Sequence, residues 1–375
     1  MIKPAAKGAE SVTTNFPKKR KCLKLSLLPA NDIVRRKLFH KEENVLESFA
    51  VRSWEIAPGE TSTSKSAYFL PNQLERVTGW AFSFEHPRRA MEGGIKADHS
   101  PTLGFLLKNA WLIDGTLYNG DARSYLQHRT SRWPLQLHVK NEFDRGAIFC
   151  TARGNKWFGQ WLMDDCPSYS LAKDEGIPVT TDLPIYTHTT AYENLFGMNP
   201  SRVHSAFFKE AVIFADVGQN RHKHTRFCAM KEKLYSQINV KSHPGVFILR
   251  GSTGEQRILK NEIELAEYLR DKRGFRILNP SNSDIQTILN VCAGAQTVVG
   301  VEGSGLIHGI LALPPGGAIL TLQPPNRFVS VYKHLTDRDD QYFGFVVGIP
   351  DGDGFRINPE EVERTLDLFP VKQYS

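Results

Sequence analysis

Apolar and amphipathic segments alternate through the last third of this sequence. Short apolar runs of strand-like length occur at 245–250, 275–278, 297–301 and 318–322. Between them, the apolar spacing typical of amphipathic helices predicts helices at 260–270, 284–292 and 304–313. Such a strand–helix series predicts a parallel sheet covered by helices on both faces, with ligands at the carboxyl ends of the strands.

The first two thirds of the chain are less regular. Residues 1–65 carry scattered charge and isolated apolar patches, which indicates an accessory N-terminal segment. From about residue 67, short apolar segments separated by Asp114-Gly115 and Asn119-Gly120 indicate β-rich structure. Near the other end, Asn358-Pro359-Glu360-Glu361 predicts a capped final helix.

These patterns predict an α/β fold with two main domains. At roughly 150 residues per domain, a chain of 375 residues suits two compact units. We expect an accessory N-terminal segment (1–65) that is β-rich or partly flexible. A first, acceptor-side domain with a β-rich start (66–240) and a second domain with the parallel sheet (241–350) follow it. The final helix (351–375) is expected to pack back across the domains.

Composition indicates a folded chain and limits its partners. Hydrophobic residues make up 41% and charged residues 23%, which is enough apolar material for packed cores. With 47 basic and 40 acidic residues, the net charge is +7, which favours anionic partners. Because these charges are dispersed and no recognition motif accompanies them, we expect no nucleic-acid partner.

Cysteine spacing and the N-terminal sequence predict a cytoplasmic protein. The five cysteines lie far apart without a C-x-x-C pair, so we expect reduced thiols. No signal-peptide pattern opens the chain, and no run approaches the roughly 18 apolar residues of a membrane span. The basic run 18–21 leaves two alternatives, a solvated arm or peripheral contact with an anionic membrane at its inner face.

A glycine-rich joint follows the third predicted strand. This glycine loop is Val299-Gly300-Val301-Glu302-Gly303-Ser304-Gly305-Leu306, and it leads into a helix. Backbone amides and the helix dipole at such a joint favour an anion, most naturally a phosphate. The spacing fits neither a dinucleotide fingerprint nor a P-loop, and a tight turn that needs only small residues is the alternative.

Two arginines flank the joint after the first predicted strand. Arg250 and Arg257 bound a polar, glycine-containing segment at the carboxyl end of that strand. Guanidinium groups suit bidentate capture of a diphosphate, and a pair of solvated arginines is the alternative. Asn261 and Glu262 start the next helix, where they can cap it and complement its dipole.

The order of these motifs resembles the catalytic region of glycosyltransferase family 61. The matching strings are Ile248-Leu249-Arg250, Arg257, Asn261-Glu262, Gly274-Phe275, the helix that contains Gln286, the glycine loop and Pro314-Pro315-Gly316-Gly317. Upstream, Phe158-Gly159-Gln160-Trp161-Leu162-Met163-Asp164 is similar to the family's glycine–histidine–tryptophan–leucine helix, which ends in a carboxylate. The resemblance covers roughly residues 145–350.

The resemblance implies both an architecture and a reaction. The architecture is GT-B, in which two Rossmann-like domains face a cleft. The reaction is inverting transfer of a sugar from a nucleotide-sugar donor, of the UDP class, to a hydroxyl of a glycan or glycolipid acceptor in surface polysaccharide or capsule biosynthesis. The implied donor-binding residues are Arg250, Arg257, Asn261, Glu262, Gly303, Ser304, Gly305 and Gln323.

Two positions depart from the family pattern. Glu302 stands where the family usually has a histidine before Gly303, and Gln160 stands at a histidine position of the upstream helix. A carboxylate beside a phosphate loop repels the donor unless it faces a hydroxyl or an arginine. The alternative function is therefore a non-catalytic relative that binds a nucleotide sugar or a glycan.

Carboxylates are the candidates for the catalytic base. Inverting transfer needs a group that removes the proton of the acceptor hydroxyl, and a carboxylate within hydrogen-bond reach suffices. Asp164 and Asp165 are the leading pair, with Glu302 as a third candidate. In a regular helix, Gln160 and Asp164 would share one face. The alternative is that both aspartates only decorate the end of a helix.

We expect neither a metal nor a cofactor. The D-x-D string Asp351-Gly352-Asp353 lies in a glycine-rich stretch between a strand and a capped helix, which favours a turn. The densest basic cluster, around His222 and His224, predicts a solvated loop, with acceptor or membrane phosphates as the alternative.

Overall fold

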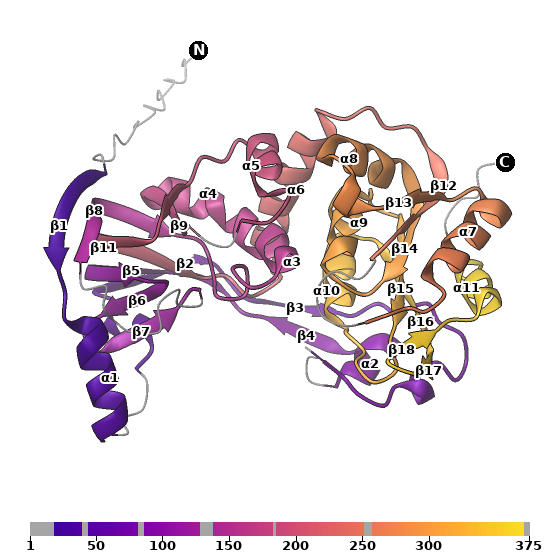
Figure 1. Ribbon diagram of the computed structural model, residues 1–375, viewed down its shortest axis with the longest axis horizontal. Helices are drawn as coiled ribbons and strands as arrows, with labels where there is room; N and C mark the ends of the chain where they lie inside the picture. Colours follow the sequence, from indigo (N-terminus) through magenta and orange to yellow (C-terminus); the bar gives the residue numbers. More distant parts are fainter. Residues whose placement is uncertain are drawn as a thin grey trace, which may run out of the picture.

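Two β-sheets organise the molecule, one in each half (Figure 1). The computed structural model describes residues 19–39, 44–81, 86–127, 138–182, 185–250 and 257–370. Helices lie between the two sheets and on the outer face of the second sheet.

The sheet of the first half mixes parallel and antiparallel neighbours. Its described strands are β1 (Arg20–Leu25), β2 (Arg52–Ala57), β5 (Thr102–Ile113), β6 (Thr116–Asn119), β7 (Ala122–Tyr125), β8 (His138–Ile148), β9 (Ile177–Thr181), β10 (Ser201–Val203) and β11 (Ser205–Ala215). Their order is β10-β9-β8-β11-β5-β6-β7, with β1 also paired to β8 and β2 to β5. The β8–β9, β9–β10 and β8–β11 pairs are parallel, and the other described pairs are antiparallel.

Tight turns explain why this sheet differs from the Rossmann-like pattern predicted for the first domain. Asp114 and Gly115 join β5 to β6 with φ angles of 45° and 73°, the left-handed pair that suits a two-residue hairpin. Gly120, with a φ of 57°, lies in the turn from β6 to β7. Parallel neighbours would need crossover connections instead, so these turns make antiparallel pairs.

The sheet of the second half is entirely parallel. Its described strands are β12 (His243–Ile248), β13 (Arg276–Leu278), β14 (Ala295–Val301), β15 (Ala318–Gln323) and β16 (Tyr342–Val347). The first four confirm the predicted strands, and β16 is an addition. The order β13-β12-β14-β15-β16 places a topological switch point between β12 and β14, where ligands bind in sheets of this kind.

Helices cover both faces of the parallel sheet. α7 (Glu262–Arg273) and α11 (Pro359–Leu366) lie on one face, and α8 (Ile285–Gly294), α9 (Ile307–Ala312) and α10 (Val331–Arg338) lie on the other. Neighbouring residues of one strand serve opposite faces, since Phe247 packs with α7 and Val246 packs with α8. Strands buried on both faces form continuous apolar runs, which is why their sequence predicts them.

The remaining elements connect and flank the sheets. The helices are α1 (Leu28–Phe39), α2 (Pro87–Glu92), α3 (Phe158–Gln160), the π-helix η3 (Trp161–Asp165), α4 (Cys166–Glu175), α5 (Thr189–Phe196) and α6 (Arg221–Tyr235). The 3₁₀-helices are η1 (Leu46–Phe49), η2 (Leu74–Arg76), η4 (Pro280–Asn282) and η5 (Ser304–Leu306). Two small antiparallel pairs are β3 (Glu60–Thr63) with β4 (Lys96–His99) and β17 (Ile349–Asp351) with β18 (Gly354–Arg356).

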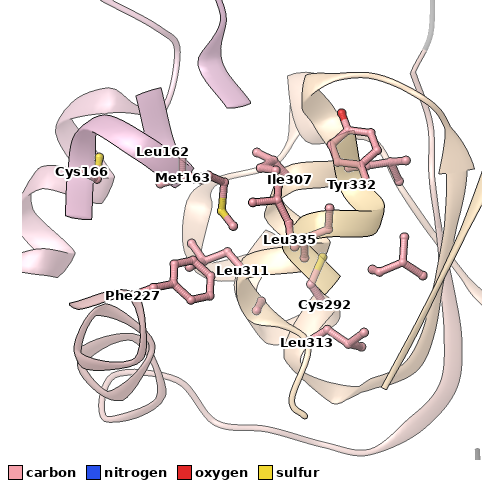
Figure 2. Close-up of a cluster of buried hydrophobic side chains, with 14 of the residues drawn as sticks. Leu162, Met163, Cys166, Phe227, Cys292, Ile307, Leu311, Leu313, Tyr332 and Leu335 are labelled. Atoms are coloured by element: carbon pink, nitrogen blue, oxygen red, sulfur yellow. The ribbon is translucent and has the colours of Figure 1, made fainter. Parts of the chain in front are cut away.

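A buried apolar cluster joins the two halves. Figure 2 shows Met163 of η3 and Phe227 of α6 facing Ile307 and Leu311 of α9. Burying one large apolar side chain contributes roughly 1.5–3 kcal/mol. The helices between the sheets therefore share one packed core, while the GT-B arrangement of the two halves stays a prediction.

Residues 67–81 connect the first half to the edge of the second sheet. Tyr68 N donates to Phe343 O at 2.8 Å, and Phe345 N donates to Tyr68 O at 3.1 Å. This segment, which the sequence assigns to the start of the first domain, thus extends the parallel sheet beyond β16. The final helix α11 also packs on this sheet, within the second half.

Candidate active site

The switch point of the parallel sheet brings predicted donor-binding residues together. Arg250 lies two residues beyond the end of β12 at Ile248, and Glu302 directly follows the end of β14 at Val301. Because β12 and β14 are parallel neighbours, their carboxyl ends meet at the same edge. The polar loop 251–256 lies outside the described residues.

Arginines converge on Glu302. Arg250 Nη1 and Arg257 Nη1 donate to its carbonyl oxygen at 3.1 and 3.0 Å. Arg257 also forms an ion pair with its carboxylate, and Arg327 Nη1 lies 3.5 Å from its Oε2. We call Arg250, Arg257 and Arg327 the arginine cluster. Since the Glu302 side chain is only 6% exposed, this is a buried charge cluster and not a pair of solvated arginines.

The arginine cluster concentrates positive charge at the sheet edge. Burial and, to a smaller extent, the charge of Arg257 lower the pKa of the Arg250 guanidinium. Glu262 supports the same residue, because its Oε1 accepts a hydrogen bond from Arg250 N at 2.7 Å. A guanidinium remains protonated in proteins, so a buried one needs an anionic partner. Here the Glu302 carboxylate is that partner for Arg257.

Gly303 and Tyr332 fix the glycine loop beside the arginine cluster. A side chain at Gly303 would collide with Arg250 Nη1, so glycine is needed for the close approach of this guanidinium. Tyr332 of α10 donates its hydroxyl to Gly303 O at 2.6 Å. Ser304 and Gly305 form the start of η5, and a side chain at Gly305 would meet open space. Tyr332 therefore holds the glycine loop in place, and the space beside Gly305 is open.

Two predicted donor-binding residues form hydrogen bonds with backbone groups outside the arginine cluster. Asn261 Nδ2 donates to Ile357 O at 2.8 Å, and Asn261 Oδ1 accepts from Ile357 N at 3.2 Å. Gln323 Nε2 donates to Val329 O at 3.1 Å, and Gln323 Oε1 accepts from Val329 N at 3.2 Å. Both side chains are buried and hold neighbouring loops. This geometry disfavours direct donor contact by either residue.

The upstream carboxylates lie on a helix that contains a π turn. Cys166 N donates to Trp161 O, the five-residue bond of a π-helix instead of the four-residue bond of a regular helix. The predicted alignment of Gln160 with Asp164 assumes a regular helix, and the structure has a π turn there instead. A side chain at Gly159 would lie 3.7 Å from the serine hydroxyl of η5, so α3 contacts the glycine loop.

The contacts of Asp165 indicate a structural role. It is fully buried, its Oδ2 accepts from Thr151 N at 3.1 Å, and its Oδ1 accepts from Thr151 Oγ1 at 2.9 Å. Burial raises the pKa of this carboxyl well above its ordinary range. A side chain at Gly154 would collide with the carboxylate. Asp165 thus organises the turn after β8, which disfavours it as the base for a substrate.

Asp164 is the more accessible aspartate, with 22% of its side chain exposed. Its Oδ1 forms an ion pair with Nζ of the fully buried Lys223 and accepts from Gln219 Nε2 at 3.3 Å. Lys223 Nζ also donates to Asp216 O at 2.8 Å. These contacts orient the Asp164 carboxylate from one side.

The sequence did not single out Lys223, Arg327 or Tyr332. Lys223 belongs to the basic cluster predicted as a solvated loop, but the structure forms α6 there, and Asn220 caps it by accepting from Lys223 N at 3.0 Å. Arg327 follows β15, so the strand-end rule contained a signal for it. Tyr332 has no local signal, since Gly303 is 29 residues away in sequence.

The D-x-D string lies in the turn between β17 and β18, which confirms the predicted turn. Arg356 Nε lies 3.1 Å from an oxygen of Asp351, and Lys260 forms an ion pair with Asp353. Both carboxylates thus have basic partners on the surface.

A comparison with protein families identifies the region that holds these groups. Residues 158–320 match the family model Glycosyltransferase 61. This region belongs to glycosyltransferase family 61. The family 61 region runs from α3 into β15 and contains Asp164, Arg250 and Glu302, whereas Arg327 and Tyr332 lie beyond it. The match confirms the predicted family and supports a glycosyltransferase activity.

The family match stands without a curated relative and without a membrane-spanning helix among the described residues. No curated protein matches the chain. Within the described ranges, no helix has both the length and the apolar character needed to cross a membrane. The family assignment therefore rests on the matched region and on the motifs inside it.

Proposed function

We propose that this family 61 protein is an inverting glycosyltransferase that binds the diphosphate of a nucleotide-sugar donor at the arginine cluster. The observation that carries the proposal is the convergence of Arg250 and Arg257 at the switch point of the parallel sheet. Ligands of such sheets bind at this edge, and guanidinium groups match phosphate oxygens in charge and geometry.

The donor is of the UDP class, and the acceptor is a hydroxyl of a glycan or glycolipid in surface polysaccharide synthesis. Two halves that face each other in a GT-B arrangement would bring donor and acceptor together. We place the reaction in the cytoplasm, at the inner face of the membrane, because a net charge of +7 favours an anionic surface.

Glu302 sets the condition for donor binding. Its carboxylate already pairs with Arg257 and lies close to Arg327. Leaving one partner of a buried ion pair uncompensated costs about 3–5 kcal/mol. A donor phosphate therefore has to take over the contacts that the Glu302 carboxylate makes with Arg257 and Arg327. The displaced carboxylate can then accept a hydrogen bond from a sugar hydroxyl.

Asp164 is the proposed catalytic base. In inverting transfer, the acceptor oxygen attacks the anomeric carbon as the bond to the diphosphate breaks, and the base takes the hydroxyl proton. Among the described residues, both polar contacts of the Asp164 carboxylate use Oδ1, which leaves Oδ2 for an acceptor. Its helix begins against the glycine loop. Asp165 and Glu302 are weaker candidates, because both side chains are more deeply buried than that of Asp164.

Guanidinium charge replaces metal charge in this proposal. The diphosphate leaving group gains negative charge as the sugar departs, and fixed positive groups stabilise that charge. The arginine cluster supplies them directly. The reaction as proposed needs no divalent ion at the diphosphate.

One observation favours the alternative of a non-catalytic nucleotide-sugar or glycan-binding protein. The Glu302 carboxylate engages Arg257 without a ligand, so the arginine cluster can be satisfied by the protein alone. In that case the fold binds sugars or nucleotides without hydrolysing or transferring them. Hydrolysis of the donor in the absence of an acceptor separates the two functions.

The test combines binding and turnover. Thermal unfolding of the full chain is followed with a panel of nucleotide sugars, since a ligand that binds the folded state raises Tm. The responding donor is then used in a transfer and hydrolysis assay. Stabilisation with turnover supports the enzyme, and stabilisation without turnover supports the binding protein. No response to any nucleotide or nucleotide sugar would overturn the donor site.

A further inference from the structure

A second polar cluster joins α6 to the end of α10. His224 and Cys228 stand four residues apart on α6 and share a face, and Asp339 directly follows α10. His224 Nε2 lies 3.2 Å from Cys228 Sγ and 3.6 Å from Asp339 Oδ1. The three potential ligand atoms all lie within 4.8 Å of one another. A nitrogen, a sulfur and an oxygen atom therefore converge on one point.

We propose that His224, Cys228 and Asp339 bind a transition-metal ion of the zinc type. The same ring nitrogen of His224 faces both the thiol and the carboxylate, although one nitrogen carries either a proton or a lone pair. A catalytic triad would use the two ring nitrogens separately. A cation at the common point serves all three atoms. The thiol proton leaves to solvent as the sulfur–metal bond forms.

Asp339 is oriented for this role. The residue is only 3% exposed. Its Oδ2 accepts from Gln341 Nε2 at 2.9 Å and forms an ion pair with Lys231. Its Oδ1 is the oxygen that faces His224. Hydrogen bonds of this kind fix a ligating carboxylate and raise metal affinity.

A cavity adjoins one ligand of the proposed site, His224. It has a volume of about 160 Å³ and is lined by His224, with His99 of β4 and His334 of α10 on its other walls. Such a volume holds several water molecules. Zinc sites with three protein ligands keep a fourth position for water or another small ligand.

The ligand atoms decide the class of metal. Mixed nitrogen, sulfur and oxygen ligands suit zinc and similar ions, whereas Mg²⁺ and Ca²⁺ prefer oxygen alone. Lys231 and Arg338 act electrostatically on Cys228, and their positive charge opposes any cation held only by charge. A thiolate–metal bond overcomes this opposition. None of the three ligands belongs to the arginine cluster, and the proposal does not rest on the proposed sugar transfer.

Cobalt is the probe for this site. The full chain is stripped of metal and titrated with Co²⁺, whose bonds to thiolate sulfur give a near-ultraviolet charge-transfer absorption. We expect one Co²⁺ per chain, and a higher Tm with Zn²⁺ than without it. Cys228→Ser should lose the charge-transfer absorption. His224→Gln should weaken Co²⁺ binding at least about tenfold.

Matched variants separate the site from adventitious binding. Cys22→Ser removes a thiol on β1, and His222→Ala removes an imidazole two residues before His224. Both should bind Co²⁺ like the wild type, and circular dichroism shows whether each variant is folded. The proposal is overturned if the wild type binds no Co²⁺, if the charge-transfer absorption persists in Cys228→Ser, or if a folded His224→Gln binds as tightly as the wild type.

Discussion

The two halves of the molecule position their charged groups in different ways. In the parallel half, Arg250, Glu302 and Arg327 follow strands β12, β14 and β15, so the sheet alone brings them to one edge. In the mixed half, Asp164 lies on a helix with a π turn and is oriented by Lys223 of another helix. Topology explains the first group, whereas the second depends on helix packing.

The largest expected effect tests the helix-borne group. Asp164→Asn keeps the size of the side chain and removes the base, so turnover should fall roughly 10²–10⁴-fold while donor affinity stays nearly constant. Asp174→Asn, an exposed position on α4, is the matched control and should remain active. If Asp164→Asn keeps full activity while Asp165→Asn or Glu302→Gln loses it, the base belongs to the residue whose loss abolishes turnover.

The strand-end group is tested by Arg250→Ala. Removing one partner of a buried charged contact should weaken UDP-type ligand binding by on the order of 2–4 kcal/mol. Titration calorimetry measures the affinity, with Arg270→Ala on the exposed side of α7 as the control. Unchanged affinity in a folded Arg250→Ala variant would remove the diphosphate from the arginine cluster.

His308 of α9 links the two halves, because its Nδ1 lies 2.7 Å from Tyr192 Oη of α5. Burial, with a smaller effect of His188, lowers the pKa of His308 from 6.5 to about 3. The folded protein therefore keeps the His308 ring neutral at pH values at which the unfolded chain binds a proton there. Its contribution to stability is present above pH 6.5 and is lost as the pH falls toward about 3.

At about 1.4 kcal/mol per pH unit, His308 should account for a loss of about 2 kcal/mol of unfolding free energy between pH 7 and pH 5. Urea unfolding of the wild type and of His308→Gln at both pH values measures this contribution. The variant should be less stable at pH 7 and less sensitive to acid. Equal acid sensitivity in the two proteins would show that His308 is not the titrating group.

The variant Glu302→Gln tests whether the Glu302 carboxylate competes with a ligand for the arginine cluster. Removing the negative charge frees the guanidinium of Arg257 for a phosphate, so UDP should bind on the order of ten times more tightly, or about 1.4 kcal/mol. The ligand-free variant should be less stable, since its arginines lose an anion. Weaker binding of UDP by Glu302→Gln would mean that the carboxylate itself contacts the ligand.

The smallest expected effect is that of a chelator. Guanidinium groups offset the diphosphate charge, so turnover should be unchanged in EDTA at temperatures well below Tm. A complete loss that Mn²⁺ restores would contradict this expectation and would bring Asp351 and Asp353 back as candidate ligands. The proposed His224 site predicts a change of Tm instead.

The predictable parts share a physical basis. Buried parallel strands have continuous apolar runs. Glycine is needed at position 303, because a side chain there would collide with the guanidinium of Arg250. Strand β16 and helix α10 also carry apolar patterns, in 342–347 and 331–338, that the strand-and-helix series could have included. By contrast, nothing local distinguishes Asn261 and Gln323, whose buried amides serve distant loops, from ligand-binding amides.

The sequence by itself determined the parallel half and its glycine loop, because periodicity and strand-end motifs are local properties. The family followed from the resemblance of the motifs in the region that the family model matches. Tertiary structure decided which carboxylate is accessible and which is buried, since Asp164 and Asp165 are adjacent in sequence yet have 22% and 0% exposure. It also decided that Glu302 pairs with arginines and that Lys223 is buried. Charge and burial are set by neighbours from distant segments, and those neighbours meet only when the chain has folded.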